Sequence, residues 1–149
     1  MSLEVYVFIK EVNIPTAESW QASIDRAGFP MTFAPGFEPL KDKGFVPCTF
    51  DGVAAGFEYV LSEIDEVASS YPNLQEKVRG YDSVVTFRWG SRLRECAVAL
   101  LAASSLTDSV SGFMYEPQEG LEIQSSQALE YASRTLMDLR AMMKRFPKR

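Results

Sequence analysis

Residues 45–61 read FVPCTFDGVAAGFEYVL, and this stretch says more about the fold than any other. Two runs rich in β-branched and aromatic residues flank the dipeptide Asp51-Gly52. Asp-Gly supplies the positive φ angles that a two-residue hairpin turn requires. The sequence therefore predicts an antiparallel hairpin, which places this part of the chain in an antiparallel sheet.

Two residues inside the predicted hairpin, Pro47 and Gly56, predict further details of the sheet. Pro47 has no backbone N–H to donate, so we expect the first strand of the hairpin to lie at an edge of the sheet. Gly56 interrupts the second strand and is expected to mark a bulge. An edge strand over residues 45–50 would also allow pairing with a second copy, so self-association stays open as one role.

Apolar periodicity extends the pattern in both directions from the hairpin. Alternating residues predict further strands around 3–9, 31–33, 84–89, 112–115 and 121–123. Helical spacing, capping residues and following glycines or prolines predict helices over about 16–27, 62–70, 92–106 and 125–143. The expected order is β-α-β-β-β-α-β-α-β-β-α.

The fold class follows from that mixed order. A largely antiparallel sheet with helices packed mainly on one face, an α+β fold, accounts for it best. The chain of 149 residues contains no internal repeat and no linker-like stretch. We therefore expect residues 1–149 to form a single globular domain.

Composition excludes several chemistries. There is no histidine, which removes the commonest general base and the usual Ser-His, Cys-His and His-containing metal sites. Cys48 and Cys96 are far apart and are expected to be buried free thiols. No phosphate loop, dinucleotide fingerprint or nucleophile elbow is present. We expect no cofactor and no metal, and a binding protein rather than an enzyme, although catalysis by carboxylate, Lys, Tyr or Ser stays open.

Charge is distributed unevenly. Residues 1–133 hold nine Lys or Arg against nineteen Asp or Glu, whereas 134–149 hold six against one. An acidic body disfavours nucleic acid and suits a basic protein partner. No signal peptide or membrane-spanning stretch is recognisable, so a cytoplasmic location is expected.

Four carboxylates form the first candidate site. Glu58, Glu63, Asp65 and Glu66 lie close together in the sequence, at a predicted strand-to-helix junction. Such a group can bind a basic partner, hold a hard cation or supply a catalytic acid and base, and it can also be a solvated surface. The spacing matches no calcium loop, so a contact with a basic protein is the functional interpretation we favour.

An arginine-rich turn forms the alternative site. Residues 88–95 read RWGSRLRE and lead from a predicted strand into a helix. Arg88, Ser91, Arg92 and Arg94, together with free backbone donors at a helix start, suit a small anion such as a phosphate or carboxylate. Structural ion pairing explains the same residues without a ligand.

Short segments of the chain resemble small bacterial α+β proteins. These segments are residues 45–52, 56–59, 84–90 and 112–117, followed by Glu119-Gly120 and a C-terminal helix. Most such proteins are uncharacterised, and some act as immunity proteins that neutralise a cognate toxin. The resemblance implies a compact binding domain that blocks its partner through a complementary surface.

Overall fold

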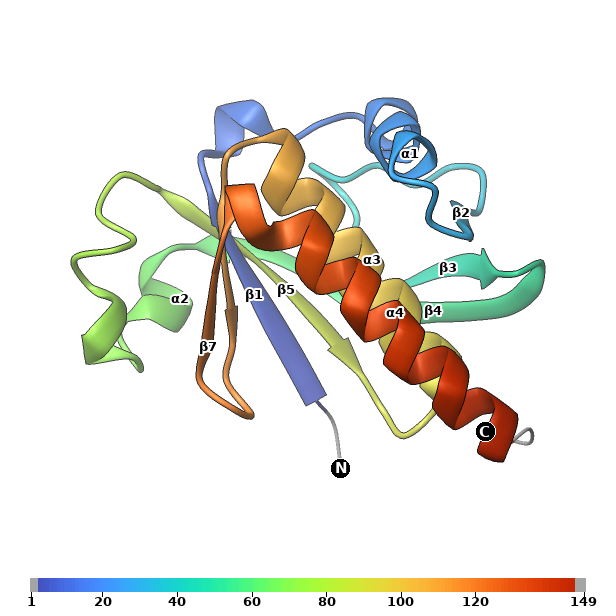
Figure 1. Cartoon of the computed structure of the whole chain (residues 1–149). Coiled ribbons are helices and arrows are strands. Elements are labelled where there is room, and N and C mark those ends of the chain that lie inside the picture. The colour runs from blue at the N-terminus through green and yellow to red at the C-terminus, as the bar shows by residue number, and fades with distance from the viewer. Residues whose placement is uncertain (1–2, 147–149) are drawn as a thin grey trace.

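The computed structural model describes residues 3–146, in which one antiparallel sheet is combined with α-helices (Figure 1). The strands are β1 (Leu3–Ile9), β2 (Met31–Phe33), β3 (Gly44–Phe50), β4 (Val53–Glu63), β5 (Ser83–Trp89), β6 (Phe113–Glu116) and β7 (Leu121–Gln124). The α-helices are α1 (Ala17–Arg26), α2 (Asp65–Ala68), α3 (Leu93–Ser109) and α4 (Ala128–Arg145). Short 3-10 turns occupy Glu11–Asn13, Pro72–Leu74 and Ser125–Gln127. The α+β fold and the predicted order of strands and α-helices are confirmed.

The seven strands lie in the order β2-β3-β4-β5-β1-β6-β7, and every neighbouring pair is antiparallel. The predicted β3–β4 hairpin is present, with φ of 51° at Asp51 and 78° at Gly52. These two positive values are those of the two-residue turn that Asp-Gly favours. The N-terminal strand β1 lies between β5 and β6, so the centre of the sheet depends on long-range pairing.

The prediction that β3 lies at an edge is wrong, because β2 pairs outside it. Pro47 is nevertheless accommodated. Its carbonyl oxygen accepts from the Ala34 N–H at 3.0 Å, so its backbone nitrogen also faces the β2 side. The Ala34–Pro47 pair therefore makes one bond where two are usual. Because β2 ends at Phe33, this pair is the last one, and the absent N–H interrupts no further pairing.

The predicted bulge at Gly56 is also wrong. The register between β3 and β4 runs without interruption, with Pro47 opposite Gly56. Gly56 is required for another reason, because the ring of Phe45 lies over it. A Cβ at Gly56 would come within 2.3 Å of Phe45 Cζ and 2.6 Å of the Val46 carbonyl oxygen.

One face of the sheet is covered by α1, α3 and α4 (Figure 1). Trp20 of α1 is fully buried at the centre of this layer. Its ring makes edge contacts with Phe33 and Phe87, at centroid distances of 5.2 and 6.0 Å. Its indole N–H donates to the Ala102 carbonyl oxygen and to Ser105 Oγ, both at 3.1 Å. The polar atom of this residue is thus satisfied inside an apolar core.

The opposite face is covered over only part of its area. Residues 64–82, which include α2, pack an apolar cluster against the β1, β5 and β6 strands. The buried members of this cluster are Tyr6, Phe8, Ala68, Leu74, Val78, Val84, Phe113 and Tyr115. Over β3 and the first half of β4, the side chains on this face are exposed or half-exposed.

Among residues 3–146, no helix combines the length and the apolar character needed to cross a bilayer.

Candidate functional site

The uncovered part of the sheet carries a surface that we call the open face. It consists of side chains on β3, β4, β5 and β1 that point away from α1, α3 and α4. Its members are Glu4, Phe45, Pro47, Thr49, Glu58, Val60 and Arg88. Their sequence neighbours, such as Val46, Cys48, Phe57 and Phe87, belong to the core on the other side. The period-two alternation of strands therefore separates core from surface at each of these positions.

Four members of the open face form one row across four adjacent strands. Phe45 lies opposite Glu58, Glu58 opposite Arg88, and Arg88 opposite Glu4. Directly opposed residues in an antiparallel pair have neighbouring side chains. The row thus presents an aromatic ring, a carboxylate, a guanidinium and a second carboxylate in that order.

The ion pair of the row is between Arg88 and Glu4. Both Nε and Nη2 of Arg88 lie 2.9 Å from Glu4 Oε2. Glu4 also accepts a hydrogen bond from the Tyr6 hydroxyl. Burial, followed by this bond, raises the pKa of Tyr6 far above its usual value, so the hydroxyl keeps its proton. Glu58 makes no ion pair within residues 3–146, and the row keeps a net negative charge.

The β6–β7 turn fixes the outer end of the row. The Glu4 N–H donates to Gln118 Oε1 at 3.1 Å, and Gln118 Nε2 donates to the Glu4 carbonyl oxygen at 3.1 Å. These two bonds hold the start of β1 beyond the point where its pairing with β6 ends. Gln118 therefore holds the backbone of Glu4 in a fixed position.

Phe45 is the apolar feature of the open face. Its side chain is 57% exposed, although the ring is held over Gly56. An aromatic ring that covers a strand glycine adds some stability to a sheet. Fixed, exposed aromatic rings are also the kind of residue that dominates protein interfaces, because little conformational entropy is lost when a partner covers them.

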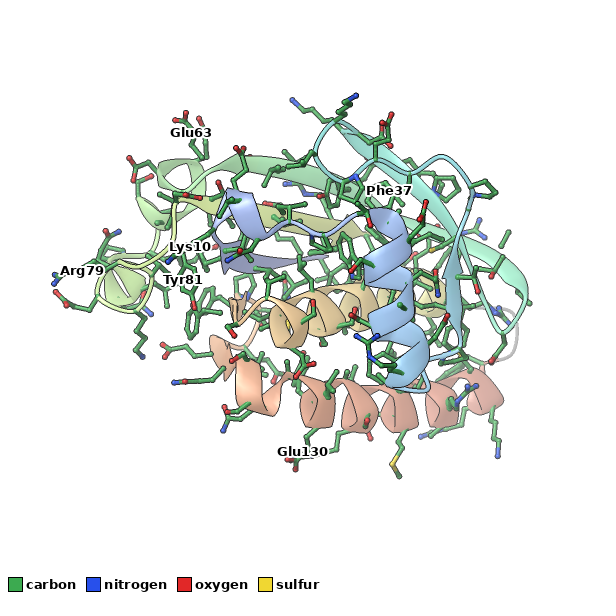
Figure 2. All side chains as sticks on the ribbon, turned by 90° about the horizontal axis from the view of Figure 1, so that it is seen from above. Lys10, Phe37, Glu63, Arg79, Tyr81 and Glu130 are labelled. Atoms are coloured by element: carbon green, nitrogen blue, oxygen red, sulfur yellow. The ribbon has the colours of Figure 1, made fainter. Side chains whose placement is uncertain are left out.

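The structure does not gather the four predicted carboxylates into one cluster. Glu58 lies on the open face, and five residues of strand, about 17 Å, separate it from Glu63. Glu63 ends β4 and points away from α4 (Figure 2), whereas Asp65 and Glu66 belong to α2. All four are exposed, and none forms an ion pair within the described chain. Residues 3–146 contain no group of three or more Asp, Glu, Cys or His placed to hold a metal ion.

The arginine-rich turn is likewise divided. Arg88 is on the open face in its ion pair with Glu4, whereas Ser91 and Arg92 are exposed in the turn before α3. Arg94 lies in the first turn of α3 and is close enough to Asp51 to help lower the pKa of that carboxyl. Arg92 is the N-cap residue of α3, and its side chain makes no capping hydrogen bond. The four residues therefore do not converge on one anion.

Three hollows surround the loop over residues 34–43, and Phe37 lines each of them. Figure 2 shows Phe37 beside α1. Their volumes are about 730, 320 and 250 Å³. The loop is anchored, because Phe37 packs on Trp20 and Tyr59 and the Tyr59 hydroxyl donates to the Pro39 carbonyl oxygen at 2.7 Å. None of these hollows contains a residue of the arginine-rich turn.

Burial keeps the two cysteine thiols and the Tyr131 hydroxyl protonated in this fold. Burial raises the pKa of Cys48 to about 12 and that of Cys96 to about 11. Burial also raises the pKa of Tyr131 to about 12. Because the thiolate is the reactive form of cysteine, both thiols are poor nucleophiles near neutral pH.

Two residues of the row, Phe45 and Glu4, were not among the sequence-based candidates, and neither was Gln118, which holds the Glu4 backbone. These three residues come from separate parts of the chain and meet through strand order. The sequence contained one indication of their position. In the period-two pattern of a strand, Phe45 and Glu4 lie on the face opposite to that of the apolar residues that follow them, Val46 and Val5.

Comparisons with protein-family models, with curated proteins and with solved structures found no match for this chain.

Proposed function

We propose that this chain is a non-catalytic protein-binding domain whose partner docks on the open face. The observation that carries the proposal is Phe45, an exposed ring held over Gly56 at the end of a row of charged side chains. Buried aromatic and arginine anchors supply most of the binding energy in typical interfaces. The open face offers one residue of each kind, Phe45 and Arg88, with Glu58 on the strand between them.

Charge favours a basic partner. Glu58 on the open face and Glu63, Asp65 and Glu66 beyond it are exposed and unpaired within the described chain. Unpaired surface charges steer a partner of opposite sign and raise the association rate more than the final affinity. We assign Phe45 to the centre of the contact and Glu63 and Glu66 to its rim.

Neutralisation of a toxin is the biological form of this function that we propose. The resemblance of residues 45–52, 56–59, 84–90 and 112–117 to small bacterial α+β proteins, some of which are immunity proteins, supports it, as does the need for nothing more than a complementary surface. The protonated thiols Cys48 and Cys96 agree with a role that involves no covalent chemistry.

The test begins with capture of the tagged protein from cells that make it, followed by mass spectrometry at low and moderate salt. The captured partner is then purified. Its association rate with the wild type is compared with its association rate with the double variant Glu63→Lys, Glu66→Lys. We expect about a tenfold slower association at low salt, and a smaller effect at high salt.

The control variant carries the same change in net charge elsewhere. Glu18→Lys with Asp25→Lys alters two acidic residues of α1 on the helix side of the sheet. Its association rate should stay within about twofold of the wild type. Equal slowing by both double variants would assign the effect to overall charge and contradict the proposed rim. Recovery of the tagged protein alone, together with thermal stabilisation by phosphate, would favour an anion-binding function instead.

A further inference from the structure

The two outer strands of the sheet, β2 and β7, treat their free edges differently. An unpaired strand edge exposes backbone donors and acceptors that another strand can bind. At β2 this edge is closed by Gln21 of α1. Gln21 Nε2 donates to the Met31 carbonyl oxygen at 3.0 Å, and Gln21 Oε1 accepts from the Phe33 N–H at 2.8 Å. One side chain thus takes the two bonds that a neighbouring strand would make.

The edge of β7 is covered only at its C-terminal end. Gln127 Oε1 accepts from the Gln124 N–H at 3.5 Å, so this N–H points away from β6. Because backbone groups alternate sides along a strand, the N–H and C=O of Glu122 point outward as well. Within residues 3–146, no side chain bonds to these outward groups of Glu122.

A groove of about 500 Å³ lies beside this edge, between β7 and α4. Leu121, which is 38% exposed, and Ile123 give it an apolar base on the strand side. Tyr131 of α4 lines the opposite wall. Figure 1 shows the β6–β7 hairpin and α4 diverging from the short turn that joins them.

The groove is acidic. Its charged lining consists of Glu116, Glu119, Glu130, Asp138 and Arg134. Arg134 is already paired with Glu130, which projects from α4 on the side away from α3 (Figure 2). Three carboxylates therefore remain without a cation within the described chain. A positively charged occupant complements this lining.

We propose that the edge of β7 binds an extended basic segment of a partner protein, which adds to the sheet as an eighth strand. The outward backbone groups of Glu122 bond to the segment. Alternate Lys or Arg side chains then reach the groove carboxylates, because side chains of a strand repeat on one face every second residue. The site goes beyond the open face and shares no residue with it.

The probe is a synthetic peptide of seven residues with blocked termini, in which lysine and valine alternate. We expect it to bind the wild-type chain and to shift the amide NMR signals of Glu122 and Gln124. A second peptide, N-methylated at every residue, has no backbone N–H to donate from either of its edges and should not bind. A third, in which glutamate replaces lysine, should also fail to bind.

Matched double variants separate the groove from general electrostatics. Glu119→Lys with Asp138→Lys should weaken binding of the Lys-Val peptide at least about tenfold. Glu18→Lys with Glu38→Lys makes the same charge change near the closed edge of β2 and leaves Gln21 and its partner Asp25 intact, and binding should stay within about twofold. Thermal unfolding of both variants establishes that each is folded.

Three results would overturn this assignment. They are an absence of binding by the Lys-Val peptide, equal binding by the N-methylated peptide, and equal weakening in the two double variants. The peptide comparison uses the unaltered chain, so it decides the question even if a variant fails to fold.

Discussion

The two faces of the central sheet differ in what covers them and in what their side chains do. The helix face is packed continuously by α1, α3 and α4 around Trp20 and Phe87. The other face has a small apolar cluster under residues 64–82 and then the open face, where Phe45 is 57% exposed. The apolar side chains buried on the helix face contribute most of the folding stability. The side chains of the open face remain exposed and available to a partner.

The largest expected difference between the faces is in chemical reactivity. Cys48 points to the helix face, where burial raises its pKa to about 12. At pH 8 its thiolate fraction should be lower than that of an unfolded cysteine by roughly a thousandfold. Alkylation by iodoacetamide, followed by peptide mass spectrometry, should therefore be very slow in native protein and fast in urea. Rapid native labelling of Cys48 would show that this face is not closed.

Trp20→Ala should produce the largest loss of stability among these predictions. It removes a fully buried ring and its two hydrogen bonds to α3, and we expect a loss of about 3–5 kcal/mol in unfolding free energy. Urea unfolding followed by circular dichroism measures it. Met137→Ala is the control, since Met137 is 72% exposed, and it should change stability by no more than about 0.5 kcal/mol. Similar losses in both would remove the contrast between core and surface.

Gly56→Ala tests the contact beneath the exposed ring. The added Cβ would lie 2.3 Å from Phe45 Cζ and 2.6 Å from the Val46 carbonyl oxygen, so we expect a loss of about 1–3 kcal/mol. In a Phe45→Ala background the loss should be smaller but not absent, because the carbonyl contact remains. A double-mutant cycle by urea unfolding separates the two contributions. No loss in the single variant would contradict the fixed position of Phe45.

The smallest effect concerns the ion pair that joins the hairpin turn to α4. Hydrogen bonds from Arg140 lower the pKa of Asp51, so the carboxylate stabilises the fold above its ordinary pKa near 4 and this contribution is lost at lower pH. Both side chains are substantially exposed, and the contribution should not exceed about 1 kcal/mol. Asp51→Asn suits the same turn.

Comparison of Asp51→Asn with the wild type by urea unfolding at pH 7 and pH 3 measures this contribution. The stability difference should shrink at pH 3. A difference that is the same at both pH values would exclude the ion pair as its cause.

Local patterns predicted most of the fold. Asp51-Gly52 identified the hairpin, and apolar spacing gave the order of strands and α-helices. The two wrong details, at Pro47 and Gly56, depended on tertiary neighbours. Pro47 is acceptable because β2 ends beside it, and Gly56 is needed because Phe45 lies over it. Neither fact can be read from local propensity.

The candidate site was less predictable than the fold. Glu58 and Arg88 were identified separately, as members of an acidic group and of an anion-binding turn. Their adjacency, and the ion pair of Arg88 with Glu4, follow from the strand order β4-β5-β1. A single sequence does not specify which distant strands pair. Closure of the β2 edge by Gln21 depends on tertiary packing in the same way.

The affinity of the captured partner for Phe45→Ala tests the central claim most directly. Isothermal titration calorimetry would compare the wild type, Phe45→Ala and the exposed control Met137→Ala, after unfolding measurements show all three to be folded. An anchor residue predicts a loss of about 2 kcal/mol, or roughly thirtyfold in Kd, for Phe45→Ala and no change for Met137→Ala. Binding of Phe45→Ala with wild-type affinity would contradict the assignment of the open face as the binding surface.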